Sequence, residues 1–532
     1  MKTSLATIAP PSFDQAYVIS DLHIGGAENF QIFSAGSQFE ALIAHILEGL
    51  ESLPRKNNTS RVLLVINGDF VDFLAEPYAS SFNMDRAPAM LDEIFERPQF
   101  EPVMKALRHF VKSDGTRLVI TLGNHDIELA LPATRRKLMH LLTNGQGELE
   151  RNVEFCFDGW GYRFQVAGRQ ALCLHGNESD QYNFTRYDEL DRVIHEIQFN
   201  GTSEFAADCR PSAGSEFVIK AINPIKKEFP FIDLLKPEIP LAATALVMLD
   251  FNKLGYAEEV VRLTTQAREN ERQRPESQRR MLSTFGTDEY HTARDKGAGR
   301  FTDAQDIEWR TQQAILDGTI DQLIDTPRDE RFLGPTEWLD SLRNAVTSTR
   351  RTIGEIRGAV VKSLKDAKQA THKLALRAAL LPLVTDDPYL TETLDRNDLA
   401  VERGIRGPYD VVFAGHTHFR RIARRPFGNG IHVNTGTWAG LMSLSRTQVI
   451  GEQFDKIYAA LMTGTREALE ENGLMLVRDE CTVARMSPGE SGQCVVTLGG
   501  VLKSANGLCA VNFDGAPTLT LTGSPNQVGG VE

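Results

Sequence analysis

Short apolar runs alternating with polar, turn-forming segments predict a mixed α/β fold. Five of these runs are rich in Val, Ile, Leu and Ala and only four or five residues long, which favours buried strands. Each run leads directly into a cluster of polar residues. The predicted strands are Ala16 to Ser20, Val62 to Ile66, Leu118 to Thr121, Ala171 to Leu174 and Val411 to Ala414.

The polar clusters after these strands consist mainly of His, Asp, Asn and Gly. Loops at the ends of buried strands commonly carry binding residues in open α/β sheets. We therefore expect the clusters to gather along one edge of a sheet. They are Asp21-Leu22-His23, Gly68-Asp69-Phe70-Val71-Asp72, Gly123-Asn124-His125-Asp126, His175-Gly176 and Gly415-His416-Thr417-His418.

These residue types suit a pair of divalent cations. A carboxylate can bridge two cations that lie roughly 3.5 to 4 Å apart, and Asp69 is the natural bridge. Asp21 and His23 are two residues apart, so in an extended segment both side chains can reach one cation. The second coordination sphere can be completed by the Asn124 amide oxygen, His175 and one of the pair His416 and His418.

Mixed carboxylate, imidazole and amide ligation indicates a transition metal. Ca prefers oxygen ligands alone, and structural Zn sites favour thiolates. We expect two divalent metal ions, with Mn²⁺ as the first choice and Fe, Zn, Co or Ni as alternatives. Each cluster alone is also typical of a turn or a helix cap, so the prediction depends on all five occurring together. His175 alone could be a core residue, but Gly176 after it favours a chain that opens toward the site.

The five clusters resemble the motifs of the calcineurin-like metallophosphoesterase superfamily. These motifs are D-x-H, G-D-x-x-D, G-N-H-D, a lone H and G-H-x-H, and all occur here in that order. The resemblance covers residues 14–180 and 408–440. It implies a four-layer αββα sandwich that hydrolyses a phosphoester or diphosphate bond with metal-activated water.

The resemblance also implies a role for each residue. Asp69 would bridge both metals, His125 would contact the scissile phosphate and protonate the leaving oxygen, and Asp126 would orient His125. Asp72 would hold a ligand imidazole through a hydrogen bond. The implied ligands are Asp21, His23 and His418 for the first metal, and Asn124, His175 and His416 for the second.

More than two hundred residues separate His175 from Gly415, so we predict a split core. Its two parts are residues 1–180 and 406–475, with a mainly helical insertion at 181–405 and a β-rich tail at 476–532 packed on the core. Residues 451–474 are expected to be helical. Thr435 and Thr437 follow a predicted strand at 431–434 and are interpreted as turn formers.

A long helix from Glu337 to Leu381 is predicted within the insertion, with an apolar stripe and many Lys and Arg residues. The basic residues have three interpretations: a solvated helix face, contacts to a phosphate-rich substrate, or docking on anionic lipid. The candidates for substrate binding are Arg350, Arg357 and Lys365.

One branch of the superfamily is especially similar. The segments VISDLHIGG, NGDFVDF, LGNHD and AGHTH resemble those of bacterial UDP-2,3-diacylglucosamine diphosphatases, whose helical insertion covers a lipid substrate. That branch usually has Arg where this chain has His125, and its insertion is much shorter. The shared segments make a nucleotide- or lipid-linked phosphate one substrate candidate.

The net charge of the chain helps to rank the candidate functions. The formal charge of −13 argues against general nucleic-acid coating, so a nuclease is the less favoured enzyme on this scaffold, with a cyclic-nucleotide phosphodiesterase as a further alternative. A non-catalytic metal-binding protein would be expected to lack a ligand, and none is missing from the motifs.

We predict the cellular location from targeting and membrane-spanning signals that the sequence lacks. The longest apolar stretch, residues 239–251, is too short to span a bilayer. The first 11 residues do not resemble a secretion signal, and the six cysteines form no C-x-x-C pair. We expect a cytoplasmic protein with reduced thiols, with peripheral membrane contact as an option.

Overall fold

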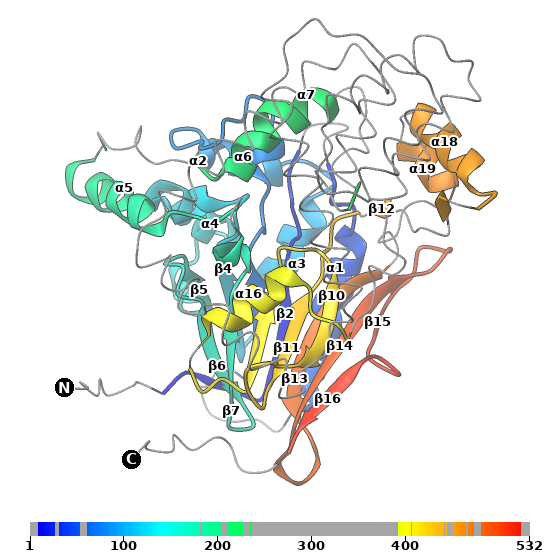
Figure 1. Cartoon of the computed structure of the whole chain (residues 1–532). Helices are drawn as coiled ribbons and strands as arrows, with labels where there is room; N and C mark the ends of the chain where they lie inside the picture. Colours follow the sequence, from blue (N-terminus) through cyan, green and yellow to red (C-terminus); the bar gives the residue numbers. More distant parts are fainter. Residues whose placement is uncertain are drawn as a thin grey trace, which may run out of the picture.

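Two β-sheets face each other at the centre of the structure (Figure 1). The computed structural model describes residues 9–26, 31–53, 61–180, 183–201, 203, 211–226, 235–236, 392–405, 407–440, 442–443, 448–449, 451–463, 466–472 and 480–522. Within these residues the larger sheet has eight strands and the smaller one six. The predicted α/β sandwich of two sheets is confirmed.

The larger sheet runs in the order β15-β14-β13-β2-β3-β4-β5, and β16 pairs with β14. β2, β3, β4 and β5 are parallel to one another, whereas β13 is antiparallel to β2. The strands are β2 (Gln15–Ile19), β3 (Val62–Asn67), β4 (Thr116–Thr121), β5 (Val153–Cys156), β13 (Glu480–Pro488), β14 (Cys494–Lys503), β15 (Cys509–Asn512) and β16 (Thr518–Leu521).

The smaller sheet runs in the order β1-β6-β7-β9-β11-β10, with β7, β9 and β11 parallel. A separate pair joins β8 (Leu235–Lys236) to β12 (Met442–Ser443). The six strands are β1 (Ser12–Phe13), β6 (Tyr162–Val166), β7 (Arg169–Cys173), β9 (Val411–Ala414), β10 (Arg420–Arg424) and β11 (Ile431–Thr435).

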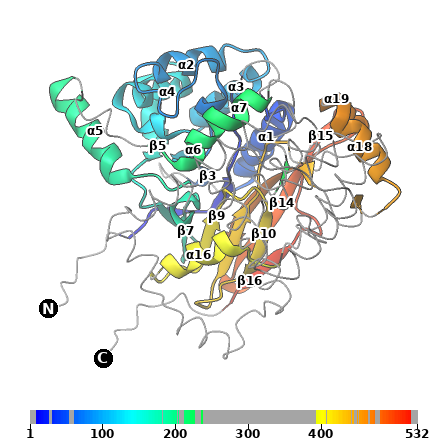
Figure 2. The ribbon, with the colours of Figure 1, turned by 45° about the horizontal axis from the view of Figure 1, so that its top comes forward.

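Helices α1 to α4 cover the outer face of the larger sheet, and the single helix α16 lies against the smaller sheet among the described residues (Figure 2). The α-helices are α1 (Gly36–Ser52), α2 (Ala87–Phe95), α3 (Glu101–Lys112), α4 (Pro132–Thr143), α5 (Tyr187–Asn200), α6 (Ala213–Phe217), α7 (Asn223–Lys226), α16 (Arg396–Gly404), α18 (Phe454–Thr463) and α19 (Arg466–Glu471). The short 3₁₀ helices are η1 (Phe73–Ala75), η2 (Ile127–Ala130), η3 (Gly147–Asn152), η4 (Asn177–Ser179) and η9 (Glu490–Gly492), and η6 (Val218–Ile222) is a π-helix. None of the described helices is long and apolar enough to cross a bilayer.

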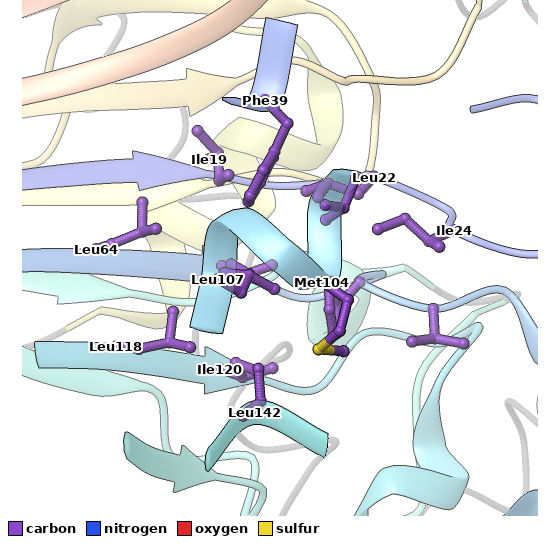
Figure 3. Packing of buried hydrophobic residues seen from close by; sticks show 14 of the residues in the cluster. Ile19, Leu22, Ile24, Phe39, Leu64, Met104, Leu107, Leu118, Ile120 and Leu142 are labelled. Atoms are coloured by element: carbon purple, nitrogen blue, oxygen red, sulfur yellow. The ribbon is translucent and has the colours of Figure 1, made fainter. Parts of the chain in front are cut away.

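Side chains of the parallel strands alternate between two cores. Tyr17 and Ile19 of β2 belong to the cluster shared with α1 and α3, whereas Ala16 and Val18 belong to the cluster between the sheets. This alternation is the period of two expected for a strand, here buried on both faces. Figure 3 shows the helix-side core, where Ile19, Leu64 and Leu118 of the strands lie with Met104 and Leu107 of α3 and other apolar side chains.

The five predicted strands all exist, but they do not share one sheet. β2, β3 and β4 belong to the larger sheet, whereas β7 and β9 belong to the smaller one. The expectation of a single sheet edge is therefore wrong. The polar clusters still meet, because the carboxyl ends of both sets of parallel strands reach the same end of the sandwich. The His416 N–H, for example, donates to the Asp21 carboxylate at 3.0 Å.

The strands of the predicted tail form part of the larger sheet. β13 pairs directly with β2 in the register Ala484↔Val18 and with β14 on its other side. The tail thus contributes interior strands instead of a layer packed outside the core. α18 and α19 occupy the predicted helical region at 451–474.

Only the two ends of the predicted insertion lie within the described residues. Its first part contains α5, α6, η6 and α7, and its last part contains α16. α5 extends away from the sheets, whereas α16 lies over β9 and β11 (Figures 1 and 2). The predicted helix from Glu337 to Leu381, with Arg350, Arg357 and Lys365, lies outside the described residues.

Candidate metal centre

Sharp left-handed turns position most of the candidate ligands. Of the eight described non-glycine residues with positive φ, five come from the predicted metal site. L-residues rarely adopt this conformation, and its strain is most often found where a structure needs an unusual side-chain direction for function. The five residues are Asp21 (φ 54°), His23 (φ 51°), Asp69 (φ 50°), His416 (φ 70°) and His418 (φ 65°).

Two motif glycines allow the loops to approach each other. A Cβ atom at Gly68, which has a φ of 81°, would overlap the His175 imidazole. A Cβ atom at Gly123 would overlap the Asp69 carboxylate. The glycines of G-D-x-x-D and G-N-H-D are therefore required because side chains of neighbouring loops occupy the space that a Cβ would need.

Asp21, His23 and His418 form the first group of donor atoms. The Nε2 atoms of His23 and His418 lie 3.1 Å apart, and Oδ1 of Asp21 is 3.3 Å from Nε2 of His418. Oδ2 of Asp69 lies 3.6 Å from Nε2 of His23. The Asp21 and His23 side chains are almost completely buried, so the donor atoms converge in a protected space.

Asp69, His175 and His416 form a second group next to the first. Nε2 of His175 lies 3.2 Å from Oδ2 of Asp69, the same oxygen that faces His23. Nδ1 of His175 donates to the Asn67 carbonyl at 2.8 Å. Since a carbonyl can only accept, this contact directs Nε2 of His175 toward the site.

The Asn124 amide oxygen is buried and has no hydrogen-bond partner among the described residues. An orphaned buried oxygen is costly unless it binds something. Donor atoms bound to one cation at the bond lengths of protein Zn sites lie roughly 3.0 to 3.6 Å apart. The separations of 3.1, 3.3 and 3.2 Å across the two groups match this spacing. The residues present therefore fit divalent cations.

Electrostatics keeps the two carboxylates of the site ionised. Burial raises the pKa of Asp21, but the imidazoles of His175 and His418 outweigh it and lower that pKa to about 2. Burial likewise raises the pKa of Asp69, but His175 and His125 hold it well below its usual value. Burial lowers the pKa of His175, whereas Asp69 and Asp21 raise it to about 10. Cation binding at these imidazoles would therefore release protons.

The partner of His125 is Asp72 and not Asp126. Nδ1 of His125 lies 3.1 Å from Oδ1 of Asp72, and the other oxygen of Asp72 lies 3.4 Å from Nδ1 of His23. Asp126 instead accepts the backbone N–H groups of Gly123 at 2.7 Å and Phe70 at 2.8 Å. The expectation that Asp126 orients His125 is therefore wrong: Asp126 joins the loops after β3 and β4.

The segment after β11 supports Asp21. The Thr437 hydroxyl donates to the Asp21 carbonyl at 2.8 Å, and the backbone N–H of Trp438 donates to the same oxygen at 3.0 Å. The Thr435 hydroxyl lies 2.6 Å from the Ser20 hydroxyl, which also contacts the Asp21 carboxylate. The interpretation as turn formers is confirmed for Thr437, whose hydroxyl accepts from the Ala439 N–H at 3.0 Å, but it is incomplete, because both threonines also hold the loop that carries Asp21.

Comparison with known families agrees with this geometry. Residues 15–224 match the family model of the calcineurin-like phosphoesterases. No curated protein and no solved structure was found to match the chain. The matched range contains Asp21, Asp69, Asn124 and His175. His416 and His418 lie outside it, and the fold brings them back to the site through β9.

Three imidazoles line the accessible side of the candidate site. Side-chain exposure is 19% for His125, 10% for His416 and 9% for His418, whereas the Asp21, His23 and His175 side chains are at most 2% exposed. A substrate would therefore reach the donor atoms from the side of these three rings.

The start of the insertion borders this site. The Ser215 hydroxyl lies 3.4 Å from the Asn124 carbonyl, and Asn223 donates to the Leu74 carbonyl at 2.8 Å. Asn124, Arg186, Ser212 and Ser215 contribute to the wall of one small cavity. The insertion thus places a guanidinium and two hydroxyl groups close to a candidate ligand.

One contact of the site involves a residue outside the motifs. Nε2 of His416 lies 2.9 Å from Oδ2 of Asp180. Only its position in a polar turn five residues after His175 distinguishes Asp180 in the sequence.

Proposed function

We propose that the chain is a dinuclear metal-dependent phosphoesterase that uses water as its nucleophile. One observation carries the proposal: Oδ2 of Asp69 lies 3.6 Å from His23 and 3.2 Å from His175, so it faces both groups of donor atoms. A carboxylate in that position is what a pair of cations requires as a bridge. The family match of residues 15–224 supports the reaction class.

In this proposal Asp21, His23, Asp69 and His418 hold one cation, and Asp69, Asn124, His175 and His416 hold the other. When bound, two divalent cations supply an acidified water molecule and offset the charge of the phosphate. The protein orients the ligands: the Asn67 carbonyl and Asp72 each engage the Nδ1 side of a ligand imidazole, leaving Nε2 for the centre.

His125 is proposed as the proton donor to the leaving oxygen. Burial lowers its pKa, but Asp72 and Asp69 outweigh burial and raise the pKa to about 9, so the ring is protonated at neutral pH. Asp72 engages Nδ1, which leaves Nε2 of His125 to meet the substrate. A protonated, positioned imidazole suits general acid catalysis.

The substrate in this proposal carries a phosphate, linked to a nucleotide or a lipid. Arg186, Ser212 and Ser215 lie near Asn124, but the Arg186 side chain is buried and paired with Glu189 at 3.4 Å, so the substrate class rests on the family match and on the donor groups. Arg350, Arg357 and Lys365 stay candidates for further phosphate contacts, and UDP-2,3-diacylglucosamine is one substrate to include in a screen.

The test begins with metal-stripped protein reloaded with Mn²⁺. Hydrolysis is then measured for bis-p-nitrophenyl phosphate, p-nitrophenyl phosphate, a nucleoside diphosphate-sugar, UDP-2,3-diacylglucosamine and single-stranded DNA. We expect Mn²⁺-dependent hydrolysis of at least one phosphoester or diphosphate. Mg²⁺, Zn²⁺, Co²⁺, Ni²⁺ and Fe²⁺ in parallel identify the preferred cation.

Asp69→Asn tests the bridge. A neutral amide cannot offset two cations, and losing several kcal/mol of stabilisation corresponds to at least about a 10³-fold loss of rate. Metal analysis should show less than two Mn²⁺ per chain. Asp114→Asn changes an exposed carboxylate between α3 and β4 and serves as the control. Near-normal turnover with two Mn²⁺ bound in Asp69→Asn would refute the proposed bridge.

A further inference from the structure

The His416 imidazole is held through one of its two nitrogens. Nε2 lies 2.9 Å from Oδ2 of Asp180, and both side chains are mostly buried. An imidazole that engages a carboxylate through Nε2 can offer only Nδ1 to a cation. The orientation of His416 in the second group of donor atoms therefore depends on a residue that belongs to none of the five motifs.

Hydrogen bonds fix both the backbone and the side chain of Asp180. The backbone N–H of Asp180 donates to the Asn177 carbonyl at 3.1 Å, and the Phe184 N–H donates to the Asp180 carbonyl at 3.1 Å. The Asn183 amide donates to Oδ2 of Asp180 at 2.8 Å. Asp180 thus has a defined side-chain direction before any ligand binds.

Asp180 and His175 belong to the same loop. η4 connects them, and Asn397 of α16 donates to the Gly176 carbonyl within this loop at 3.1 Å. One short segment after β7 therefore supplies an imidazole of the second donor group directly and orients the other imidazole through a carboxylate. The first donor group consists of Asp21, His23 and His418, and His416, which Asp180 contacts, belongs to the second group.

We propose that Asp180 is a positioning residue that holds His416 with Nδ1 toward Asp69 and Asn124 and thereby sets the affinity of the second cation. The inference rests on the proposed dinuclear function. Asp180 acts through His416, so its removal should leave the first cation bound and weaken the second. Carboxylates behind ligand histidines commonly change metal affinity by about 10- to 100-fold.

The experiment titrates metal-stripped protein with Mn²⁺ and follows it by calorimetry and electron paramagnetic resonance. Wild type should bind two Mn²⁺ and show the signal of a spin-coupled pair. Asp180→Ala should bind the first Mn²⁺ as wild type does, bind the second about 10- to 100-fold more weakly, and lose the coupled signal at two equivalents. Asp180→Asn should lose less, because its amide oxygen can still accept from Nε2–H.

Two controls separate positioning from a general structural role. Asp188→Ala removes an exposed carboxylate at the start of α5 and should change neither affinity. In a His416→Ala background, adding Asp180→Ala should cause no further loss, since the residue through which Asp180 acts is already absent. Asp180→Leu, which keeps most of the side-chain volume, replaces the alanine variant if that one does not fold.

Three outcomes would overturn the inference. They are unchanged affinity for both ions in Asp180→Ala, equal weakening of both ions, and a further loss when Asp180→Ala is added to His416→Ala. A wild-type protein that binds one Mn²⁺ without a coupled signal would instead refute the dinuclear function, and the positioning role with it.

Discussion

At the scale of single residues, the site combines strained backbone with close side-chain packing. Asp21, His23, Asp69, His416 and His418 all have positive φ. Conformations of this kind cost on the order of 1 to 3 kcal/mol each. The surrounding contacts offset that cost: the Asp21 carbonyl, for instance, accepts from both Thr437 and Trp438. The strained loops orient the donor atoms toward one another, and this orientation lowers the stability of the loops themselves.

His125→Ala tests proton donation at this scale. We expect metal content to stay normal while the rate on an alkyl phosphoester falls roughly 10²- to 10⁴-fold, the usual contribution of a general acid. A p-nitrophenyl ester should lose less, because its leaving group needs no proton. Asp72→Asn should act in the same direction, since Asp72 raises the pKa of His125. Steady-state kinetics on both esters checks this. Equal losses on both would mean that His125 positions the phosphate instead.

At the scale of elements, α16 links the second part of the core to both imidazole loops. Asp395 and Asp398 form a capping box at its start. Asp398 and Glu402 are buried and face His432 of β11, at 3.2 and 2.9 Å from its two ring nitrogens. Asn434 of β11 then donates to Asp398 and to the Gly415 carbonyl. The helix thus holds the start of the G-H-T-H loop through a buried charged network.

This network predicts a pH-dependent stability. Burial lowers the pKa of His432, but Asp398 and Glu402 raise it to about 9. The ordinary value is about 6.5, so the charged imidazole stabilises the fold fully below that pH and its contribution disappears as pH rises through 9. The free energy of unfolding lost in His432→Gln should be on the order of 3 kcal/mol larger at pH 6 than at pH 9.5.

Urea unfolding of wild type and His432→Gln at pH 6, 7.5 and 9.5 measures this difference. His109→Gln, at an exposed histidine of α3, provides the matched control. A stability difference for His432→Gln that is the same at all three pH values would contradict the charged state of the ring.

At the scale of the whole molecule, three distant segments build one site. Residues 15–224 match the phosphoesterase family, β9 brings His416 and His418, and the tail strand β13 pairs with β2, which leads into Asp21. The tail also buries apolar side chains in the two cores, namely Val483, Met486, Val496, Leu498, Val501 and Leu521. Its strands are therefore needed for the fold that holds the candidate metal ligands.

Ending the chain after residue 479 should abolish folding. The six side chains contribute roughly 1.5 to 3 kcal/mol each, comparable to the total stability of about 5 to 15 kcal/mol of a typical domain. β2 would also become an exposed edge strand. Circular dichroism, thermal unfolding and Mn²⁺ stoichiometry check this. Ending the chain after residue 522 removes none of the described strands and is the control; a folded, Mn²⁺-binding protein ending at 479 would contradict the prediction.

The sequence by itself determined the strands and the polar residues that gather at the candidate site. The predicted strand at Val62 to Ile66 is observed as Val62–Asn67, and that at Val411 to Ala414 has the same bounds. Local signals suffice for this, because apolar runs, turn glycines and ligand side chains act within a few residues of one another. The Asp, His and Asn residues quoted from the motifs are the ones that the fold brings together.

Only the tertiary structure decided how these pieces meet. The segments that form β2 and β7 have similar apolar patterns, because both strands are buried on two faces. Such a pattern does not predict which sheet a strand joins. The choice between Asp72 and Asp126 as the partner of His125 depends on side-chain directions in two different loops. The pairing of β13 with β2 and the contact of Asp180 with His416 join residues hundreds of positions apart. Such contacts form through long-range packing, which short-range sequence patterns do not predict.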